Sequence, residues 1–297
     1  MVSCEALAEV PRRGAGRAET TMLPTFLVIG AMKAGTTSLH AYLSSHPDVF
    51  MSEPKELDFF VEGRNWDRGL GWYEDRFAGA GAAAARGEAS TNYTKDPFFG
   101  GVPERIHSVI PDVRLVYVVR HPIRRMVSEY WHHVAEYGER RPLGEALRTN
   151  PMLFALSDYA AQLDRYTGLF PPEHLLVITS EALYGARAET LRSIFSFLGI
   201  DDAWRPPNLD ARLHRSEMKA APTTVGARVP WLRERAASTA TPAPLRRVLK
   251  KLTERFPSEA DSSVPVEVEA ELRQRFRVSV ERLRAFLPPS FDGWGIG

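Results

Sequence analysis

The chain has 297 residues, of which 44% are hydrophobic and 25% are charged, and its formal net charge is +1. This length allows one large domain or two small ones with a substantial core. The near-neutral charge excludes a strongly basic binder of nucleic acids or membrane surfaces, because both need clustered positive charge. We therefore expect neither nucleic acid nor membrane as a partner.

The beginning of the chain predicts a tail rather than a folded element. The single cysteine, Cys4, lies there, so an internal disulfide or a cysteine metal site cannot form. Residues 1–22 are rich in Ala, Gly, Arg and Glu and lack the apolar core of a secretory signal, and no run is long enough to span a membrane. We expect a disordered tail over residues 1–22, a single domain over residues 23–297 and a cytoplasmic location.

The first folded stretch has the pattern of a strand, an anion-binding loop and a helix. An apolar run ends at Gly30, and a helical pattern opens at Thr36. Gly30 and Gly35 have the spacing of a nucleotide-triphosphate loop, but the lysine expected after Gly35 is missing and Lys33 lies inside the loop. A lysine there would lie beside the terminal group of a bound nucleotide. The alternative is an ordinary strand-to-helix turn.

The next segment, residues 49–60, is a charged loop that leads into an aromatic pair. It follows a helix that we expect to end near Pro47, and it carries Glu53 and Glu56. Its position directly after the phosphate loop and its helix indicates one wall of a site. The alternative is a solvated connector whose aromatic residues cover the core.

A second candidate site follows a buried strand. Residues 113–119 are almost continuously apolar, which is typical of a strand covered on both faces of a parallel sheet. Arg120 stands at its carboxyl end, where ligands of open α/β sheets bind, and Ser128 follows about two turns into the next helix. A nucleotide hydrolase would need an aspartate there to hold magnesium. The cation instead predicts a second phosphate and no metal, unless Arg120 only caps the helix or forms an ion pair.

The remaining patterns alternate between helices and strands. We expect helices over 66–77, 103–109, 151–169, 191–198 and 266–286, and strands over 86–90 and 174–179. Residues 78–85 and 200–227 read as loops, and residues 228–255 are basic and poorly patterned. We expect residues 200–255 to form a variable loop and helices over the site.

Together these stretches resemble the sulfotransferases that use 3′-phosphoadenosine-5′-phosphosulfate (PAPS). Residues 30–38 are similar to the 5′-phosphosulfate loop of that family, and residues 115–120 with Ser128 to its 3′-phosphate motif. Residues 55–60, 69–73 and 102–106 are similar to runs in the heparan sulfate sulfotransferase branch and in bacterial enzymes like it. The resemblance covers residues 24–200. It implies an α/β fold: a P-loop-type three-layer domain with a mostly parallel sheet of four or five strands and helices on both faces.

The resemblance also implies roles for individual residues. Lys33 would stabilise the leaving oxygen. The 5′-phosphosulfate would be held by the loop residues Lys33, Ala34, Gly35, Thr36, Thr37 and Ser38. Arg120 and Ser128 would hold the 3′-phosphate, with Arg215 from the late loop as a further contact. The donor would be PAPS, the nucleotide product adenosine 3′,5′-bisphosphate, and no metal would be required.

Glu56 would be the general base that takes the proton from the acceptor hydroxyl, with Glu53 as the second choice. Lys55 could contact substrate or sulfate. For His132 and His133, which follow Ser128, a packing or surface role is favoured over contact with the acceptor.

The chain also departs from the heparan branch. That branch often has histidine at the position of Asp58 and a disulfide near the late loop, whereas residues 214–219 here lack cysteine. The acceptor therefore stays open among sugars, phenols, lipids, antibiotic scaffolds and protein tyrosine. The Ala- and Arg-rich composition is compatible with a bacterial origin. Two other functions remain: a P-loop kinase or nucleotide hydrolase, and a non-catalytic nucleotide-binding module.

Overall fold

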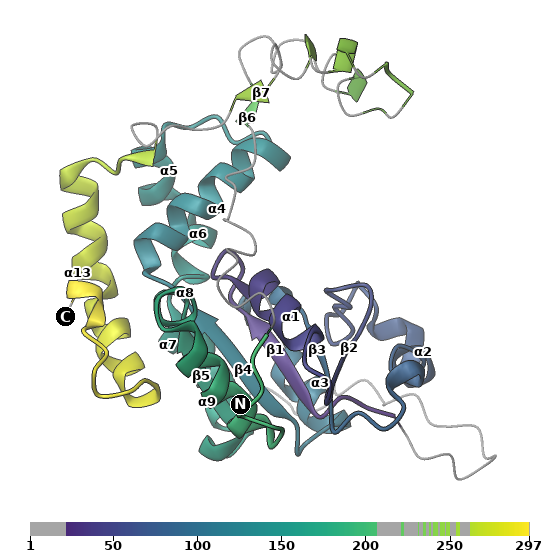
Figure 1. Cartoon of the computed structure of the whole chain (residues 1–297). Coiled ribbons are helices and arrows are strands. Elements are labelled where there is room, and N and C mark those ends of the chain that lie inside the picture. The colour runs from purple at the N-terminus through teal and green to yellow at the C-terminus, as the bar shows by residue number, and fades with distance from the viewer. Residues whose placement is uncertain are drawn as a thin grey trace, which may run out of the picture.

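The centre of the molecule is a parallel five-stranded sheet with the strand order β2-β3-β1-β4-β5 (Figure 1). The structure, a computed structural model, describes residues 22–206 and 262–296 and short separate stretches between 221 and 255. The strands are β1 (Phe26–Gly30), β2 (Val49–Met51), β3 (Ala85–Ala89), β4 (Arg114–Val119) and β5 (Leu175–Thr179). The predicted parallel sheet is confirmed.

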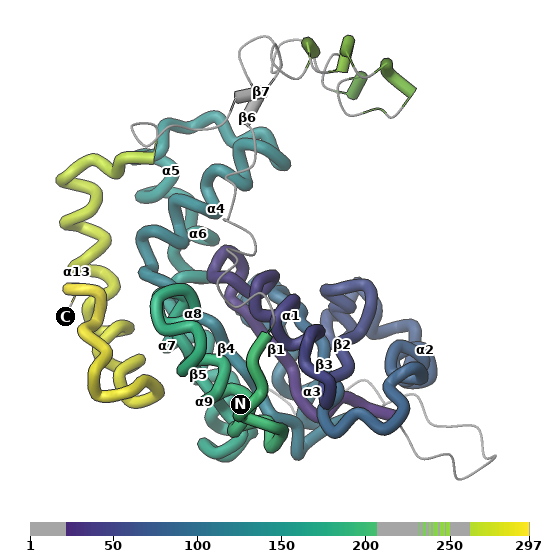
Figure 2. The backbone as a smooth tube through the Cα atoms, viewed as in Figure 1, coloured from purple at the N-terminus to yellow at the C-terminus, as the bar shows by residue number. Residues whose placement is uncertain are grey.

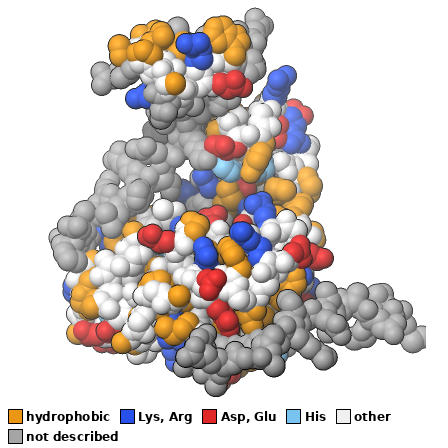
Figure 3. All heavy atoms as spheres, turned by 90° about the vertical axis from the view of Figure 1, so that its right-hand side faces the viewer, with side chains coloured by type: hydrophobic (Ala, Val, Ile, Leu, Met, Phe, Trp, Pro, Cys, Tyr) orange, Lys and Arg blue, Asp and Glu red, His pale blue; other side chains and the backbone are white. Residues whose placement is uncertain are grey.

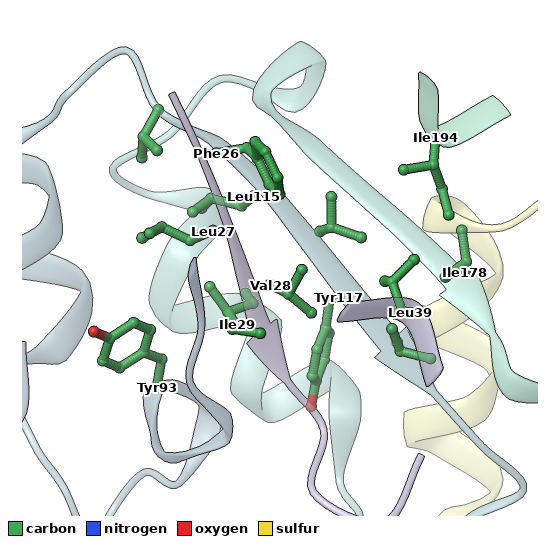
Figure 4. Close-up of a cluster of buried hydrophobic side chains, with 14 of the residues drawn as sticks. Phe26, Leu27, Val28, Ile29, Leu39, Tyr93, Leu115, Tyr117, Ile178 and Ile194 are labelled. Carbon is green, nitrogen blue, oxygen red and sulfur yellow. The ribbon is translucent and has the colours of Figure 1, made fainter. Parts of the chain in front are cut away.

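The central strand β1 is apolar throughout because both of its faces are covered. Its residues from Phe26 to Ile29 are completely buried. Figure 4 shows Leu27 and Ile29 on the side of Tyr93, and Val28 on the side of Leu39. This double burial explains why the strand reads as a continuous hydrophobic run rather than as an alternating one.

Helices on both faces complete three layers. In Figure 1, α1 and α9 cover one face of the sheet, and α3 and α7 cover the other. The helices are α1 (Thr36–Ser44), α2 (Gly69–Asp75), α3 (Val102–Val109), α4 (Pro122–Glu136), α5 (Leu143–Thr149), α6 (Pro151–Ala155), α7 (Tyr159–Thr167), α8 (Ser180–Gly185), α9 (Arg187–Leu198) and α13 (Val266–Leu283). The predicted fold class, an α/β domain with helices on both faces, is confirmed.

A second apolar cluster lies beside the sheet. Helices α4, α5, α6 and α13 contribute to it, with Met126, Leu147, Leu153, Leu272 and Phe276 buried in it. In Figure 2 the C-terminal helix α13 runs alongside the other three, although most of the chain's second half separates it from them in sequence. This second cluster positions α4 over the carboxyl ends of the strands.

Several elements differ from the predicted ones. Residues 49–51, predicted as part of a loop, form the edge strand β2, which pairs with β3. The single helix predicted over 151–169 is two helices, because the Asp158 carboxylate accepts a hydrogen bond from the Ala161 N–H and starts α7. The helices α5 and α8 were not predicted. The helix predicted over 191–198 begins earlier, at Arg187, and ends as predicted at Gly199, which has the left-handed conformation.

Some predictions fall on other parts of the chain. Residues 1–21 and 207–220, which include Arg215, lie outside the described residues. Between 221 and 255 the structure describes an antiparallel pair of short strands, β6 (Ala221–Pro222) and β7 (Glu254–Arg255), with β6 next to α4. None of the helices in the described part of the chain is both long and apolar enough to cross a membrane.

Candidate active site

The loop between β1 and α1 has a backbone that departs from both strand and helix geometry. Lys33 and Gly35 both have the left-handed conformation, with φ angles of 70° and 104°. A Cβ atom at Gly30 would lie 2.1 Å from Oγ1 of Thr94, so only glycine fits at that position. Gly35 is the N-cap of α1, and the first turn of α1 carries no acidic side chain. The partial positive charge of the helix start therefore faces the loop.

This loop borders a cavity of about 860 Å³. Lys33, Thr36, Thr37 and Ser38 line one side of it, and Glu56 lines another. The structure thus places the two predicted catalytic residues around one space. Ala34 is buried outside the lining, and its N–H donates to the Ala31 carbonyl at 3.1 Å.

A second cavity of about 590 Å³ lies at the carboxyl end of β4. Arg120 and Ser128 both line it, as the sequence predicted, together with Arg124 and the ion pair between Arg273 and Glu269. Arg120 also joins the two cavities, because its Nη1 donates to the Lys33 carbonyl oxygen at 3.2 Å. Burial lowers the pKa of Arg120, so this guanidinium is a partly desolvated cation.

Glu56 is held mainly through its backbone. It has a φ angle of 67°, and its N–H donates to the carbonyl of Ala89 at the end of β3, at 3.1 Å. The Lys55 ammonium donates to Oε1 of Glu56 at 2.6 Å, and the Glu56 side chain is 41% exposed. Glu53, the second choice for the base, is exposed and is not among the residues that line the large cavity.

The segment that carries Glu56 rests on a buried carboxylate at the end of β3. Glu88 is completely buried and accepts hydrogen bonds from Tyr73, Tyr93 and Ser90 at 2.6, 2.7 and 2.8 Å. Burial raises the pKa of Glu88 to about 7, against the opposing effect of the three hydroxyl donors. Because Oγ of Ser90 also accepts from the Asp58 N–H at 3.0 Å, the cluster is tied to the segment that carries Glu56.

Asp58 itself lines the large cavity and packs against Asn92. The Asn92 amide donates to Oδ2 of Asp58 at 2.7 Å, and Arg64 lies 3.9 Å from the same oxygen. Burial raises the pKa of Asp58, and the neighbouring Glu56 adds to that effect, whereas Asn92 and Arg64 oppose it. The wall of the cavity next to Glu56 is therefore acidic.

Helix α4 also contributes to the lining of the cavity, through Glu129 and the two histidines. Arg125 is completely buried and donates to Ser157, to Glu129 at 2.8 Å and to the Met32 carbonyl at 3.4 Å. Burial alone would raise the pKa of Glu129, but Arg125 and the hydrogen bond with His133 hold it at about 2. Glu129 is therefore an anion at neutral pH, and Arg125 links α4 to the loop between β1 and α1.

His132 and His133 line the large cavity together with Glu129. Both are buried and pack against the ring of Tyr137. The sequence favoured a packing or surface role, and the structure gives them packing contacts and also a place on the cavity wall.

Sequence reasoning missed several lining residues. Lys95 lines the large cavity, its Nζ lies 3.2 Å from the sulfur of Met32, and burial lowers its pKa. Lys95 follows shortly after the end of β3, so the rule that pointed to Arg120 after β4 would have indicated residues 90–95 as well. Phe98, Phe99 and Tyr137 carried no comparable signal.

Comparison with known proteins assigns the chain to a family. The sulfotransferase family model matches residues 24–206. The mouse heparan sulfate glucosamine 3-O-sulfotransferase 6 is 32% identical over 188 residues, a match that covers 60% of this chain and 52% of that protein. The bovine bifunctional heparan sulfate N-deacetylase/N-sulfotransferase 2 is 30% identical over 201 residues, covering 60% of this chain and 22% of that protein. The match thus spans about half or less of these relatives.

A solved structure extends the similarity over almost the whole chain. The crystal structure of a sulfotransferase from Alicyclobacillus acidocaldarius covers 92% of this chain and 98% of its own, with 25% identity and a TM-score of 0.65. The family model covers well over half of the chain. The matched part includes Lys33 and Glu56 at the first cavity and Arg120 and Ser128 at the second. The chain therefore belongs to the sulfotransferase family.

Proposed function

We propose that the protein transfers the sulfuryl group of PAPS to the hydroxyl group of an acceptor. The observation that carries this proposal is the pairing of two cavities, each lined by the residues that we predict to bind an anion. Lys33 and Glu56 line one cavity, Arg120 and Ser128 line another, and the Arg120 side chain bonds to the Lys33 carbonyl between them. A nucleotide with phosphates at two ends matches this arrangement.

The residues of the first site fit a 5′-phosphosulfate group. The left-handed backbone at Lys33 and Gly35 and the start of α1 present N–H groups and positive charge to an anion. Thr36, Thr37 and Ser38 add hydroxyl donors. The residues of the second site fit a 3′-phosphate, because Arg120 is a partly desolvated cation that a dianion would neutralise.

Under this proposal, the protein contributes to the reaction mainly by stabilising the charge that develops in the transition state. Sulfuryl transfer resembles phosphoryl transfer, an in-line displacement in which charge builds up on the leaving oxygen. Lys33 would stabilise that charge, and Glu56 would take the acceptor proton. The nucleotide product, adenosine 3′,5′-bisphosphate, is a stable anion, so we expect the reaction to proceed without a metal ion.

Two alternative functions, a P-loop kinase or hydrolase and a non-catalytic binding module, make different predictions. A P-loop kinase or hydrolase would have its lysine after Gly35 and an aspartate at a strand end for magnesium, but Thr36 and Arg120 stand there. A non-catalytic nucleotide-binding module would bind the nucleotide without turnover. The relatives named for heparan sulfate suggest a sugar as acceptor, but this chain matches only part of the length of those proteins.

Calorimetry without metal tests the donor. We expect adenosine 3′,5′-bisphosphate to bind at least tenfold more tightly than AMP, because a charge-assisted hydrogen bond contributes about 1.5–3 kcal/mol. Arg120→Ala should weaken the bisphosphate and leave AMP almost unchanged. Arg277→Ala, at an exposed position on α13, is the control and should change neither affinity. Equal affinities of the parent protein for the two nucleotides would refute the proposal.

A further inference from the structure

Lys95 carries a partly buried ammonium group at the large cavity. It directly follows the short helical turn Thr91–Thr94 after β3, and it lines the cavity together with Lys33 and Glu56. Burial lowers the pKa of Lys95, because water no longer hydrates the charge fully. A cation in this state is stabilised by an anion that binds to it.

The ammonium group of Lys95 has few partners in the protein. It donates to the sulfur of Met32 at 3.2 Å, and a thioether is a weak acceptor. The charge of Glu129 acts on Lys95, but the Glu129 carboxylate is engaged by Arg125 at 2.8 Å and by His133 at 3.4 Å. Two of the three N–H groups of Lys95 therefore have no acceptor among the residues that the structure describes.

The backbone around Lys95 is fixed on two sides. The N–H groups of Phe98 and Phe99 donate to the Lys95 carbonyl at 2.8 and 3.0 Å. The buried side chain of Gln162 on α7 holds the next residue, Asp96, through its N–H and its carbonyl, at 3.1 and 2.8 Å. The side chain of Lys95 therefore starts from a rigid point beside the cavity, which lowers the entropy cost of placing its charge against a ligand.

Lys95 is close both to the donor loop and to the predicted base. Its partner Met32 belongs to the loop between β1 and α1 and precedes Lys33. The carboxylates of Glu56 and Asp58, from the segment after β2, are close enough for their charges to raise the pKa of Lys95 against burial. In an in-line displacement the sulfuryl group passes from the leaving oxygen to the acceptor oxygen, so its other oxygens would face the space that Lys95 borders.

The other described cations that line the large cavity have neighbours or roles of their own. Arg64 lies 3.9 Å from the carboxylate of Asp58, and we assign Lys33 to the leaving oxygen. The outer surface offers no uniform positive field instead: in Figure 3, Lys and Arg side chains are interspersed with Asp, Glu and hydrophobic ones over the face that is drawn. Lys95 is therefore the cation that is left for the sulfuryl oxygens.

We infer that the Lys95 ammonium binds the oxygens of the sulfuryl group, both in the bound donor and during transfer. This inference rests on the proposed function and adds a contact residue to its site. The bond between sulfur and the leaving phosphate oxygen breaks while the bond to the acceptor oxygen forms, and the acceptor proton goes to Glu56. Lys95 keeps its protons throughout, because its task is to balance the charge that is spread over the sulfuryl oxygens.

Binding of the donor and of its nucleotide product tests this inference without any acceptor, because PAPS carries the sulfuryl group and adenosine 3′,5′-bisphosphate does not. We expect Lys95→Met to weaken PAPS at least tenfold in calorimetry, since charge-assisted hydrogen bonds are lost, and to change the affinity for the bisphosphate less than twofold. Lys95→Arg keeps the charge and should bind PAPS at least threefold more tightly than Lys95→Met. Arg277→Met, at an exposed position on α13, is the control and should change neither affinity.

Chemical labelling of the parent protein gives a measurement that does not depend on a variant. Reductive methylation with formaldehyde, read by mass spectrometry, should modify Lys95 at least threefold more slowly with PAPS bound than with the bisphosphate bound. Lys55 is not among the residues that line the large cavity, so it is the control and should be modified at the same rate with either nucleotide.

The outcomes separate this inference from the proposed function. If Lys95→Met weakens both nucleotides equally, or neither of them, Lys95 only supports the surrounding structure, and the inference is wrong while the donor assignment stands. Equal labelling of Lys95 with the two nucleotides would lead to the same conclusion. If the parent protein does not bind the bisphosphate, the proposed function itself fails.

Discussion

At the scale of single residues, Lys33 contributes to the site through both its side chain and its backbone. Its side chain lines the large cavity, while its carbonyl accepts the hydrogen bond from Arg120. Its left-handed backbone, with φ of 70°, lets it do both within a short loop. Because the backbone task does not need the ammonium group, the side chain can be changed without removing the link to Arg120.

Lys33→Ala should therefore separate catalysis from binding. We expect kcat to fall by about 10²- to 10³-fold, because under the proposed function the ammonium would stabilise charge that exists only in the transition state. The affinity for adenosine 3′,5′-bisphosphate should fall much less, as measured by calorimetry beside steady-state kinetics. If turnover survives and only donor affinity drops, Lys33 is a binding residue.

Glu56→Gln tests the base. The amide keeps the shape of the side chain but cannot accept a proton, so we expect activity to fall by about 10²- to 10⁴-fold with donor affinity unchanged. The loss should be greatest with aliphatic alcohols and smaller with an acidic phenol, which needs less help from a base. Rates of sulfate transfer to matched alcohols and phenols measure this. Glu53→Gln is the control. If Glu53→Gln is inactive while Glu56→Gln is active, Glu53 is the general base instead of Glu56.

At the scale of elements, the segments that follow the strands build the site. The loop after β1 provides Lys33, the segment after β3 provides Asn92 and Lys95, and the end of β4 provides Arg120. The buried strands and two of these ends could be predicted because continuous apolar runs and glycine spacing are local patterns. Residues 90–95 follow the same rule and were overlooked.

Other parts of the site depend on contacts that no local pattern encodes. The edge strand β2 has three residues, and α5 and α8 have seven and six, too few for a clear period. Glu88 reads as a charged residue in a short strand, yet it is buried under two tyrosine hydroxyls that come from α2 and from the turn after β3. The meeting of Phe98 with Tyr137 around one cavity likewise follows from tertiary packing.

The burial of Glu88 at the end of β3 has a measurable pH dependence. Its pKa of about 7 in the folded protein lies above the value of 4.5 for an unburied glutamate. Between these two pH values the folded state holds a proton that the unfolded state has lost. The contribution of Glu88 to the free energy of unfolding is therefore full below pH 4.5 and is lost as the pH rises through 7. At roughly 1.4 kcal/mol per pKa unit, the free energy of unfolding should lose about 3 kcal/mol across this range.

Glu88→Gln should remove this dependence. Urea unfolding at pH 5, 6, 7 and 8 should show the parent losing stability relative to the variant as pH rises. Glu173→Gln, at an exposed position, is the control and should follow the parent. Parallel curves for the parent and Glu88→Gln would show that Glu88 titrates normally.

At the scale of the whole molecule, the large cavity lies between two apolar clusters. The sheet cluster carries the loops after β1 and β3, and the second cluster carries α4 with Glu129, His132 and His133. Arg125 connects the two, because it is on α4 and donates to the Met32 carbonyl in the loop between β1 and α1. A ligand that fills the cavity would therefore touch elements that are anchored in both clusters.

The bisphosphate should accordingly stabilise the whole domain. At a concentration of 100 times its Kd, it should raise the free energy of unfolding by about 2.7 kcal/mol, and AMP at the same concentration should do less. Thermal unfolding measures both effects. EDTA should leave the stabilisation unchanged, and a loss of stabilisation in EDTA would contradict metal-free binding.

The hydrogen bond between Arg120 and the Lys33 carbonyl fixes the distance between the edges of the two cavities. Under the proposed function, the protein recognises the distance between the two anionic groups of its nucleotide as well as each group by itself. A nucleotide with its second phosphate on the 2′ rather than the 3′ oxygen has the same charge but a different separation. We expect this isomer to bind at least tenfold more weakly than adenosine 3′,5′-bisphosphate in calorimetry, and equal affinities would contradict recognition by separation.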